Sequence, residues 1–337
     1  MNIKKLAKEI GVSSATVSRA INNSGYVSDA TKKKVLDAVS RYQYVPSAVA
    51  RSLSTQDTHS VGVIIPDIEN DFFSSMISGI SEVAEKNGYN IHFLGSNENI
   101  QSEHSFLETV ERQRLDGVII TPISEVDDIT KTRLTKMEKS GIPVVLVDRD
   151  IAGETFEGVF VDNLAGAYDG VNALIKAGHE KIAIITGPET SKPGKERYKG
   201  YKKAMLDHGI TLKEEYMVSG DFKLEKAYQC TKQLLDLVNP PTAIFTSNNL
   251  TTLGCLKYLT EHKIKVGRQI SILGFDDVEI LKLIAYKLSV VTRDSKQQGR
   301  EAMLLMLDRL HNKKMPDKPK RITIPYQVIL RGSERLK

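Results

Sequence analysis

Apolar residues near the amino terminus recur at helical spacing, which predicts a short first helix. The positions on its buried face are Ile3, Leu6, Ala7 and Ile10. Gly11 follows and ends the helix, because glycine readily takes the left-handed backbone of a helix terminus. Ser13 is a good N-cap for a second helix, whose inward positions are Val17, Ala20 and Ile21. Helix, glycine turn and helix together predict a helix-turn-helix head.

A third helix completes the predicted head. Ser28 can cap it, and it extends over residues 29 to about 42. The inward positions expected are Val35, Leu36 and Val39, while the lysines at 32–34 are available to phosphates. A lysine run is usually only a solvated helix face, so this one gains meaning from the motif beside it.

From residue 61 onward, short apolar segments alternate with longer amphipathic ones, which predicts parallel strands flanked by helices. The expected strands are residues 61–66, 90–95, 116–121, 143–148, 158–162, 181–187, 243–247 and 271–275. The predicted fold class is therefore α/β behind a helical head. Ligands of such sheets bind beyond the carboxyl ends of the strands, so the residues that follow each strand are the expected site.

Charge divides the chain at the same place as the pattern. The 337 residues include 47 Lys and Arg against 42 Asp and Glu, and residues 1–58 hold nine of the bases but only four of the acids. The excess of positive charge lies entirely in this first part, which favours a polyanionic partner. The length suits a head plus a body of one or two domains.

The cysteine content and the distribution of apolar residues indicate where the protein acts and which cofactors it needs. Cys230 and Cys255 lack the spacing of a disulfide framework or a zinc site, so a reduced cytoplasmic location, no metal and no cofactor are expected. We find no signal-peptide pattern and no run of 18 apolar residues, so no membrane partner is expected.

Residues 44–54, Tyr-Val-Pro-Ser-Ala-Val-Ala-Arg-Ser-Leu-Ser, together with Ser-Ser-Ala-Thr-Val-Ser-Arg at 13–19, resemble the LacI/GalR family of bacterial transcriptional regulators. The resemblance covers essentially the whole chain. It implies a homodimeric repressor that leaves a palindromic double-stranded operator when a small sugar binds. The expected domains are a helix-turn-helix domain at 1–45, a hinge helix and linker at 46–59, and a ligand-binding and dimerisation domain at 60–337.

The body also resembles the periplasmic sugar-binding proteins of the ribose type, which have two lobes around a ligand cleft. This resemblance implies an N-lobe of residues 60 to about 160 plus 292–322. The C-lobe is expected at about 161–291 plus 323–337. It also favours D-ribose or another pentose as the effector, and a sugar-utilisation operon as the target.

The resemblance assigns DNA contacts to the second helix and the hinge. Ser14 and Ala15 are expected to face base edges, and Arg19 can make a bidentate contact to guanine. Thr16 and Ser18 are expected at phosphates. For the small residues Ser14 and Ala15, ordinary helix capping is the alternative interpretation.

Residues 47–54 are too short to form a stable helix alone, so we expect them to order when two copies pack on DNA. Ala50 is small enough for their close approach. Leu53 is the expected minor-groove wedge, at a flexible central step such as CG.

Candidate effector contacts follow the predicted strands. In the N-lobe, Asn70 can satisfy a hydroxyl, and Phe72 and Phe73 can pack on a sugar ring or belong to the core. Asp148 and Arg149 present acceptors and donors together, which suits neighbouring hydroxyls, although a surface ion pair is the plainer interpretation.

In the C-lobe, the resemblance to ribose-type proteins adds Arg197, Asn248 and Asp276. Two positions depart from the ribose-type pattern: Arg293 replaces a usual Gln, and Asn248-Asn249 replaces Asn-Asp. Arg293 either favours a carboxylate- or phosphate-bearing sugar or is neutralised by Asp150 or Asp294.

Other functions remain open at this point. Within the family, a corepressor-type regulator controlled by a purine or a phosphocarrier protein is one alternative, and a repressor responding to a sugar acid or phosphosugar is another. An enzyme is not expected, since the nucleophile-elbow, P-loop and zinc-protease motifs are missing. A plain sugar-binding module would not explain the helix-turn-helix head.

Overall fold

The computed structural model describes residues 1–23, 25–44, 58–153, 156–312 and 318–336. It has two compact units, Met1–Thr58 and His59–Lys337. The predicted hinge positions Ala50 and Leu53 lie outside the described residues, so the hinge helix stays a prediction. Among the described residues, no helix has the length and apolar character needed to cross a membrane.

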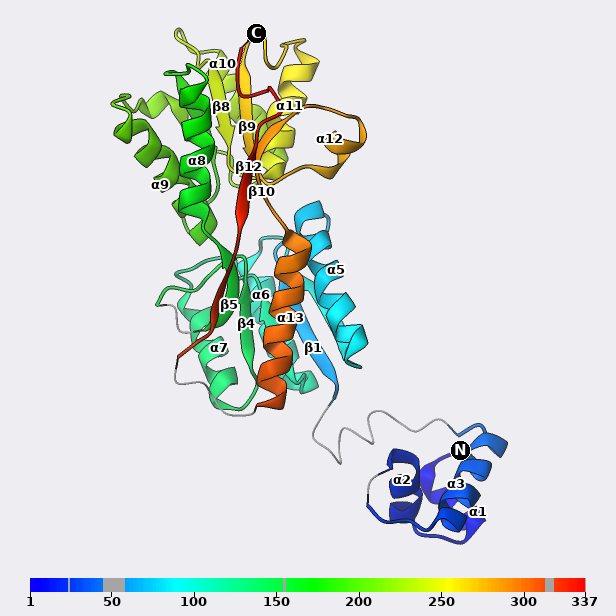
Figure 1. The fold of residues 1–337 in the computed structure, drawn as a ribbon. Helices are drawn as coiled ribbons and strands as arrows, with labels where there is room; N and C mark the ends of the chain where they lie inside the picture. Colours follow the sequence, from blue (N-terminus) through cyan, green and yellow to red (C-terminus); the bar gives the residue numbers. More distant parts are fainter. Residues whose placement is uncertain (24, 45–57, 154–155, 313–317, 337) are drawn as a thin grey trace. The chain divides into compact units, whose positions relative to one another are not determined.

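The first unit is a three-helix head made of α1 (Ile3–Ile10), α2 (Ser14–Asn22) and α3 (Asp29–Arg41) (Figure 1). Gly11 ends α1 with a φ of 68°. Ser13 caps α2, its hydroxyl accepting the Thr16 N–H at 3.1 Å, and Ser28 caps α3 in the same way. The small core joins all three helices through Leu6, Ala7, Ile10, Val17, Ala20, Val35 and Ala38.

One predicted inward position of the head is wrong. Leu36 is 45% exposed, whereas Val35 and Ala38 are buried. Positions three and four apart share a helix face, so residues 35, 38 and 39 point to the core. Leu36 lies about 100° further round the helix and cannot join them.

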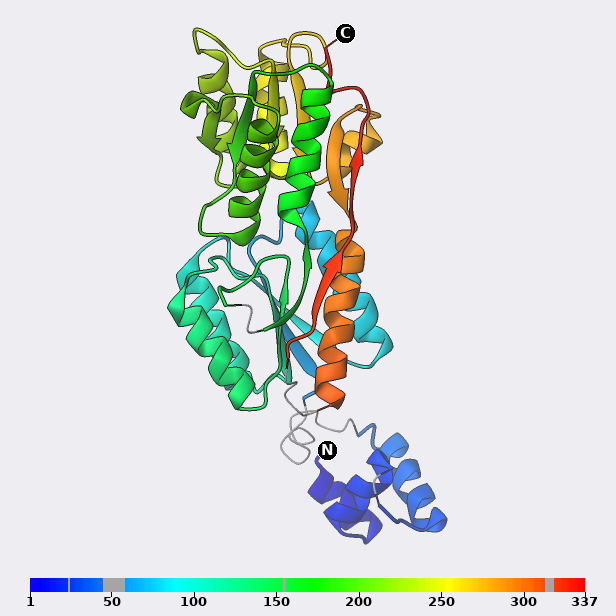
Figure 2. The same cartoon turned by 60° about the vertical axis from the view of Figure 1, so that its left-hand side comes forward.

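The second unit contains two six-stranded sheets, each covered by helices on both faces (Figures 1 and 2). The N-lobe sheet has the strand order β11-β5-β4-β3-β1-β2 and is parallel throughout. Its elements are β1 (Ser60–Ile65), α5 (Asp71–Lys86), β2 (Asn90–Gly95), α6 (Ile100–Gln113), β3 (Gly117–Ile120), α7 (Asp128–Lys139), β4 (Val144–Val147), β5 (Glu157–Val161), α13 (Ser295–His311) and β11 (Arg321–Ile324).

The C-lobe sheet has the order β12-β10-β9-β8-β6-β7, with only the β10–β12 pair antiparallel. Its elements are α8 (Asn163–Lys176), β6 (Ile182–Thr186), α9 (Lys192–Asp207), the 3-10 helix η1 (Glu214–Tyr216), β7 (Met217–Ser219), α10 (Leu224–Leu235), β8 (Ala243–Thr246), α11 (Asn249–Glu261), β9 (Ser271–Phe275), α12 (Glu279–Leu283), β10 (Ser289–Arg293) and β12 (Tyr326–Ile329). The α/β fold class predicted from the sequence is confirmed.

Alternation along the buried strands explains why both faces need helices. In β1, Val61, Val63 and Ile65 belong to one core cluster, whereas Ile64 belongs to another. Successive strand residues point to opposite faces, so a fully apolar strand must be covered twice. Helices α5 and α13 cover one face of the N-lobe sheet, and α6 and α7 cover the other.

The chain passes between the lobes three times: after β5, after β10, and between β11 and β12 (Figure 2). Thr292 and Arg293 end β10 in the C-lobe sheet, although the expected boundary assigns them to the N-lobe. Thr323 and Ile324 belong to β11 in the N-lobe sheet rather than to the C-lobe.

Four strands were not among the predicted ones: β7, β10, β11 and β12. Strands β7, β11 and β12 lie at the edges of the sheets. Most of their residues are only partly buried or exposed, so they lack the continuous apolar run that marks the central strands. The eight predicted strands are all present, within a residue or so at each end.

Candidate functional site

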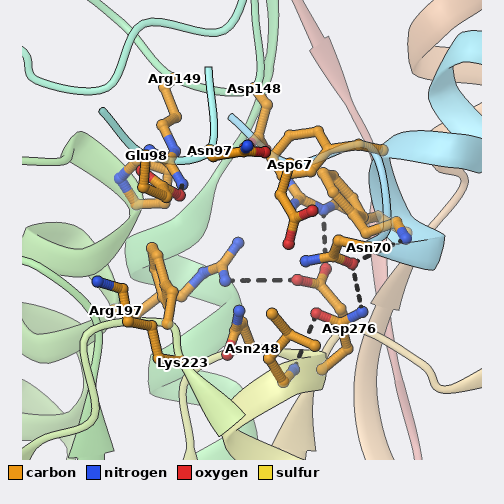
Figure 3. A pocket seen from close by; sticks show the side chains of 17 residues that line it. Asp67, Asn70, Asn97, Glu98, Asp148, Arg149, Arg197, Lys223, Asn248 and Asp276 are labelled. Carbon is orange, nitrogen blue, oxygen red and sulfur yellow. Dashed lines mark hydrogen bonds and ion pairs between the residues drawn. The ribbon is translucent and has the colours of Figure 1, made fainter. Parts of the chain in front are cut away.

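A cavity of about 200 Å³ lies between the two lobes, at the carboxyl ends of their strands (Figure 3). Seventeen residues line it. All nine residues predicted as effector contacts are among them: Asn70, Phe72, Phe73, Asp148, Arg149, Arg197, Asn248, Asp276 and Arg293. The structure therefore brings the predicted set together, from segments up to about 220 residues apart in sequence.

Two of the cavity residues are also helix caps. Asn70 caps α5, its side-chain oxygen accepting the Phe72 N–H at 3.0 Å. Asn248 caps α11, its oxygen accepting the Thr251 N–H at 2.8 Å. Each cap satisfies a helix N–H that would otherwise lack a partner. The amide oxygens are thus engaged within the protein.

The two buried aspartates occupy matching positions in the two lobes. Asp148 follows β4 and Asp276 follows β9, with φ values of 66° and 65°. Their backbone N–H groups donate to Val159 and Val291 respectively, which hold the left-handed turns in place. Such a backbone costs a non-glycine residue of order 1 kcal/mol and is typical of functional sites.

Arg293 lies between these two aspartates. Its Nε donates to Asp276 Oδ1 at 3.0 Å, and its Nη1 forms an ion pair with Asp148 Oδ1 at 2.7 Å. Burial disfavours the charged form, but the two carboxylates together raise the pKa of Arg293 above its usual value. Arg293 also stacks on the Phe72 ring, 4.3 Å from the centroid.

The predicted partners of Arg293 are wrong. Asp294 caps α13 by accepting the Gln297 N–H, and Asp150 pairs with Lys192 and Arg321. Only the fold reveals the actual partners, because Asp148 is 145 positions away along the chain.

Asp148 and Arg149 both line the cavity, but they do not pair with each other. Arg149 instead forms a bidentate ion pair with Glu98, at 2.6 Å and 3.0 Å. Burial works against its charge, but the Glu98 carboxylate raises the pKa of Arg149 above the usual value. Figure 3 shows Glu98 beside Arg149, turned away from Asp148.

Arg197 is fully buried and only partly satisfied. It donates to Asn163 Oδ1 at 2.9 Å and to the Ser247 carbonyl at 2.6 Å, and it lies 3.5 Å from Asp276. Its Nη2 atom has no hydrogen-bond partner. Burial, and then the neighbouring Arg293 and Arg149, lower the pKa of Arg197 to about 10, so it stays charged at neutral pH.

Several lining residues were missed by the sequence analysis. Asn97 and Glu98 follow β2, a predicted strand, so the rule of looking beyond strand ends would have found them. Phe222 and Lys223 follow β7, which gave no strand signal. The other missed residues are Asp67, Pro193, Asn249 and Leu250.

Aromatic rings border the cavity in both lobes. Phe73 is buried in the N-lobe core, whereas Phe72 is only partly buried, and their rings meet edge to face at 5.1 Å. Phe222 lies against Arg149 and Arg197, at 5.7 Å and 5.9 Å from its centroid. A Cβ at Gly187 would be 2.3 Å from the Phe222 ring, so only glycine allows this approach.

Helix α2 presents the predicted DNA contacts on one side of the head. Ala15 and Arg19, one turn apart, are exposed, and Ser14, Thr16 and Ser18 are half-buried. Val17 and Ala20 are buried in the core on the other side of the helix. The Thr16 hydroxyl is 2.9 Å from that of Ser13, so it belongs to the cap.

A helix-turn-helix head followed by a two-lobed α/β body with a polar cleft defines a class of ligand-responsive DNA-binding proteins. Comparison with known families agrees. Residues 2–47 match the family described as "Bacterial regulatory proteins, lacI family", and residues 58–331 match "Periplasmic binding proteins and sugar binding domain of LacI family".

Individual proteins extend the comparison. The probable transcriptional repressor ExuR of Bacillus subtilis is 34% identical over 87% of this chain and 86% of its own. A putative ribose operon repressor from Burkholderia thailandensis is 26% identical, with a TM-score of 0.70 over 80% of this chain and 99% of its own. The lac repressor dimer bound to operator and an anti-inducer shares the fold, with 23% identity and a TM-score of 0.85 over 99% of both chains.

The chain belongs to the LacI family. It is a DNA-binding transcriptional repressor with a sugar-binding domain. The relatives named as transcriptional repressors, among them ExuR of Bacillus subtilis, are consistent with the prediction that it is not an enzyme.

Proposed function

We propose that the protein is a cytoplasmic homodimeric repressor that leaves its operator when a small neutral sugar, such as D-ribose or another pentose, binds between the lobes. The observation that carries the choice of a neutral effector is the position of Arg293 between Asp148 and Asp276. The one cation that departs from the ribose-type pattern is thus already compensated by the protein.

The charges of the whole cavity support a neutral ligand. Its charged lining residues balance, with Asp67, Glu98, Asp148 and Asp276 against Arg149, Arg197, Lys223 and Arg293. A hydroxyl group can accept a hydrogen bond as well as donate one, so a sugar can serve the Nη2 atom of Arg197, which has no hydrogen-bond partner within the protein. Phe72 and Phe222 offer faces for the apolar side of a sugar ring.

The switch follows from the position of the cavity. A ligand that contacts both lobes favours one arrangement of them, and its coupling to DNA binding must be reciprocal. Two helix-turn-helix heads are needed to read two half-sites, hence the dimer and the near-palindromic operator. We assign base contacts to Ser14, Ala15 and Arg19, phosphate contacts to Thr16 and Ser18, and hinge contacts to Ala50 and Leu53.

Fluorescence anisotropy of a labelled near-palindromic operator with a central CG step tests this function. The protein is titrated alone, with D-ribose, and with a panel of sugars and sugar acids. We expect D-ribose to release the DNA, and Arg197→Met to bind the operator but no longer respond. Release by anionic sugars alone would move the effector to the sugar acids, and tighter DNA binding with a ligand would show a corepressor.

A further inference from the structure

The ion pair between Glu98 and Arg149 is a built feature of the cleft. Arg149 is 4% exposed and Glu98 24%, and both guanidinium Nη atoms donate to the carboxylate. Both residues belong to the N-lobe, at the ends of β2 and β4. The pair therefore does not depend on how the lobes are arranged.

The backbone around Glu98 holds this side chain at the cavity. Asn97 and Glu98 have φ values of 52° and 54°, a left-handed pair that non-glycine residues rarely adopt. The Glu98 N–H donates to the Pro66 carbonyl at 3.0 Å, and the Ser96 N–H donates to Ile65 at 2.9 Å. These hydrogen bonds fix the turn to the end of β1 and hold the backbone of Glu98 at the edge of the cavity.

Without Glu98 the cleft would contain an uncompensated cation. Arg149 and Arg197 flank the same Phe222 ring, and the Nη2 atom of Arg197 has no hydrogen-bond partner. Arg293 is already engaged by Asp148 and Asp276. The three remaining carboxylates would face four cations, and a planar guanidinium pairs readily with carboxylate, sulfate or phosphate groups.

We propose that Glu98 determines the charge class of the effector: it provides Arg149 with the negative charge that an anionic ligand would otherwise bring, and so restricts the cleft to neutral sugars. This inference rests on the proposed function, since it explains how a cleft with four cations selects an uncharged effector. Arg149 keeps further N–H groups with which to donate to a hydroxyl.

Binding of inorganic sulfate tests the proposal without knowledge of the effector. Isothermal titration of the full-length protein with sulfate, against chloride at equal ionic strength, compares wild type, Glu98→Gln and the double variant E98Q/R149Q. We expect wild type to bind no sulfate at millimolar concentrations and E98Q to gain at least tenfold in affinity. The double variant should lose that gain, because Arg149 is the group set free.

Glu69→Gln is the matched control, since it removes one exposed carboxylate near the cleft that does not line the cavity. It should bind sulfate as wild type does. Melting curves in chloride check that each variant is folded, and Glu98→Asn makes the same charge change if E98Q is not.

Two results would overturn the proposal: wild type that already binds sulfate as tightly as E98Q, or E98Q that gains nothing. A parallel titration with D-ribose and other neutral sugars separates the two proposals. If sulfate binding follows the expected pattern but no neutral sugar binds wild type, the role of Glu98 stands and the proposed effector is wrong.

Discussion

A single residue, Arg293, compensates the charges of the two aspartates in this cleft. Its side chain is only 2% exposed and lies between two aspartates that are themselves buried. An ion pair of this kind contributes little net free energy compared with apolar packing, because both charges lose water. Removing one partner, however, leaves a buried charge without compensation. The main contribution of Arg293 to stability is therefore that it neutralises the buried carboxylates of Asp148 and Asp276.

We expect Arg293→Gln to lower the free energy of unfolding by roughly 3 kcal/mol in the absence of ligand, because Asp148 and Asp276 lose their shared cation. Urea denaturation measures the change. The exposed Arg268 offers the control, since Arg268→Gln should stay within about 0.5 kcal/mol of wild type. An unchanged midpoint for R293Q would mean that the aspartates find other partners.

At the scale of elements, the cleft is built from helix N-termini. Asn70 and Asn248 are the N-cap residues of helices α5 and α11, and both asparagines line the cavity. The Asn70 oxygen also accepts a hydrogen bond from the Asn249 side chain at 2.7 Å, which joins the start of one helix to that of the other. Asn249, which departs from the ribose-type Asp, supplies the donor that an ionised aspartate would lack.

Substitutions at Asn248 should separate capping from ligand binding. Asn248→Asp keeps a carbonyl-type oxygen for the cap but loses the amide donor, whereas Asn248→Ala loses both. We expect N248A to cost about 1 kcal/mol of stability and N248D much less. Both should weaken binding of the neutral sugar that releases the DNA, as measured by titration calorimetry. Equal destabilisation by the two variants would show that the cap is not what Asn248 contributes.

At the scale of the whole molecule, charged residues connect the lobes beside the cavity. Asp150 of the N-lobe pairs with Lys192 of α9 at 2.8 Å, and it also pairs with Arg321 of its own lobe. Lys195 of α9 pairs with Glu125, whose backbone N–H donates to the Thr190 carbonyl. These contacts join the two lobes beside the cavity.

Lys192→Met should weaken the contact between the lobes. It should not leave the buried Asp150 carboxylate uncompensated, because Arg321 still pairs with it. Small-angle scattering of residues 59–337, which form a compact unit, should give a larger radius of gyration than wild type. Arg321→Met is the matched comparison, since it removes the partner within one lobe. If both variants expand the protein equally, the Lys192 contact is not what joins the lobes.

The sequence by itself determined the head, eight of the twelve strands described in the body and nine of the seventeen residues that line the cleft. These features depend on local rules: apolar periodicity, N-caps at Ser13 and Ser28, and the convergence of parallel strands at their carboxyl ends. Residues that directly follow such strands must meet, whatever their distance along the chain. The nine expected cleft residues were found for this reason, together with the family resemblance.

Only the tertiary structure decided which charges pair. Arg149 has Asp148 beside it in sequence but binds Glu98, and Arg293 binds Asp148 and Asp276 rather than Asp294. Ion pairing depends on distances of a few ångströms between side chains from different strands, and no periodicity along the chain encodes those distances. The sequence therefore predicts many of the charged groups of the cleft, whereas the fold decides that Arg149 pairs with Glu98 and that Arg293 pairs with Asp148 and Asp276.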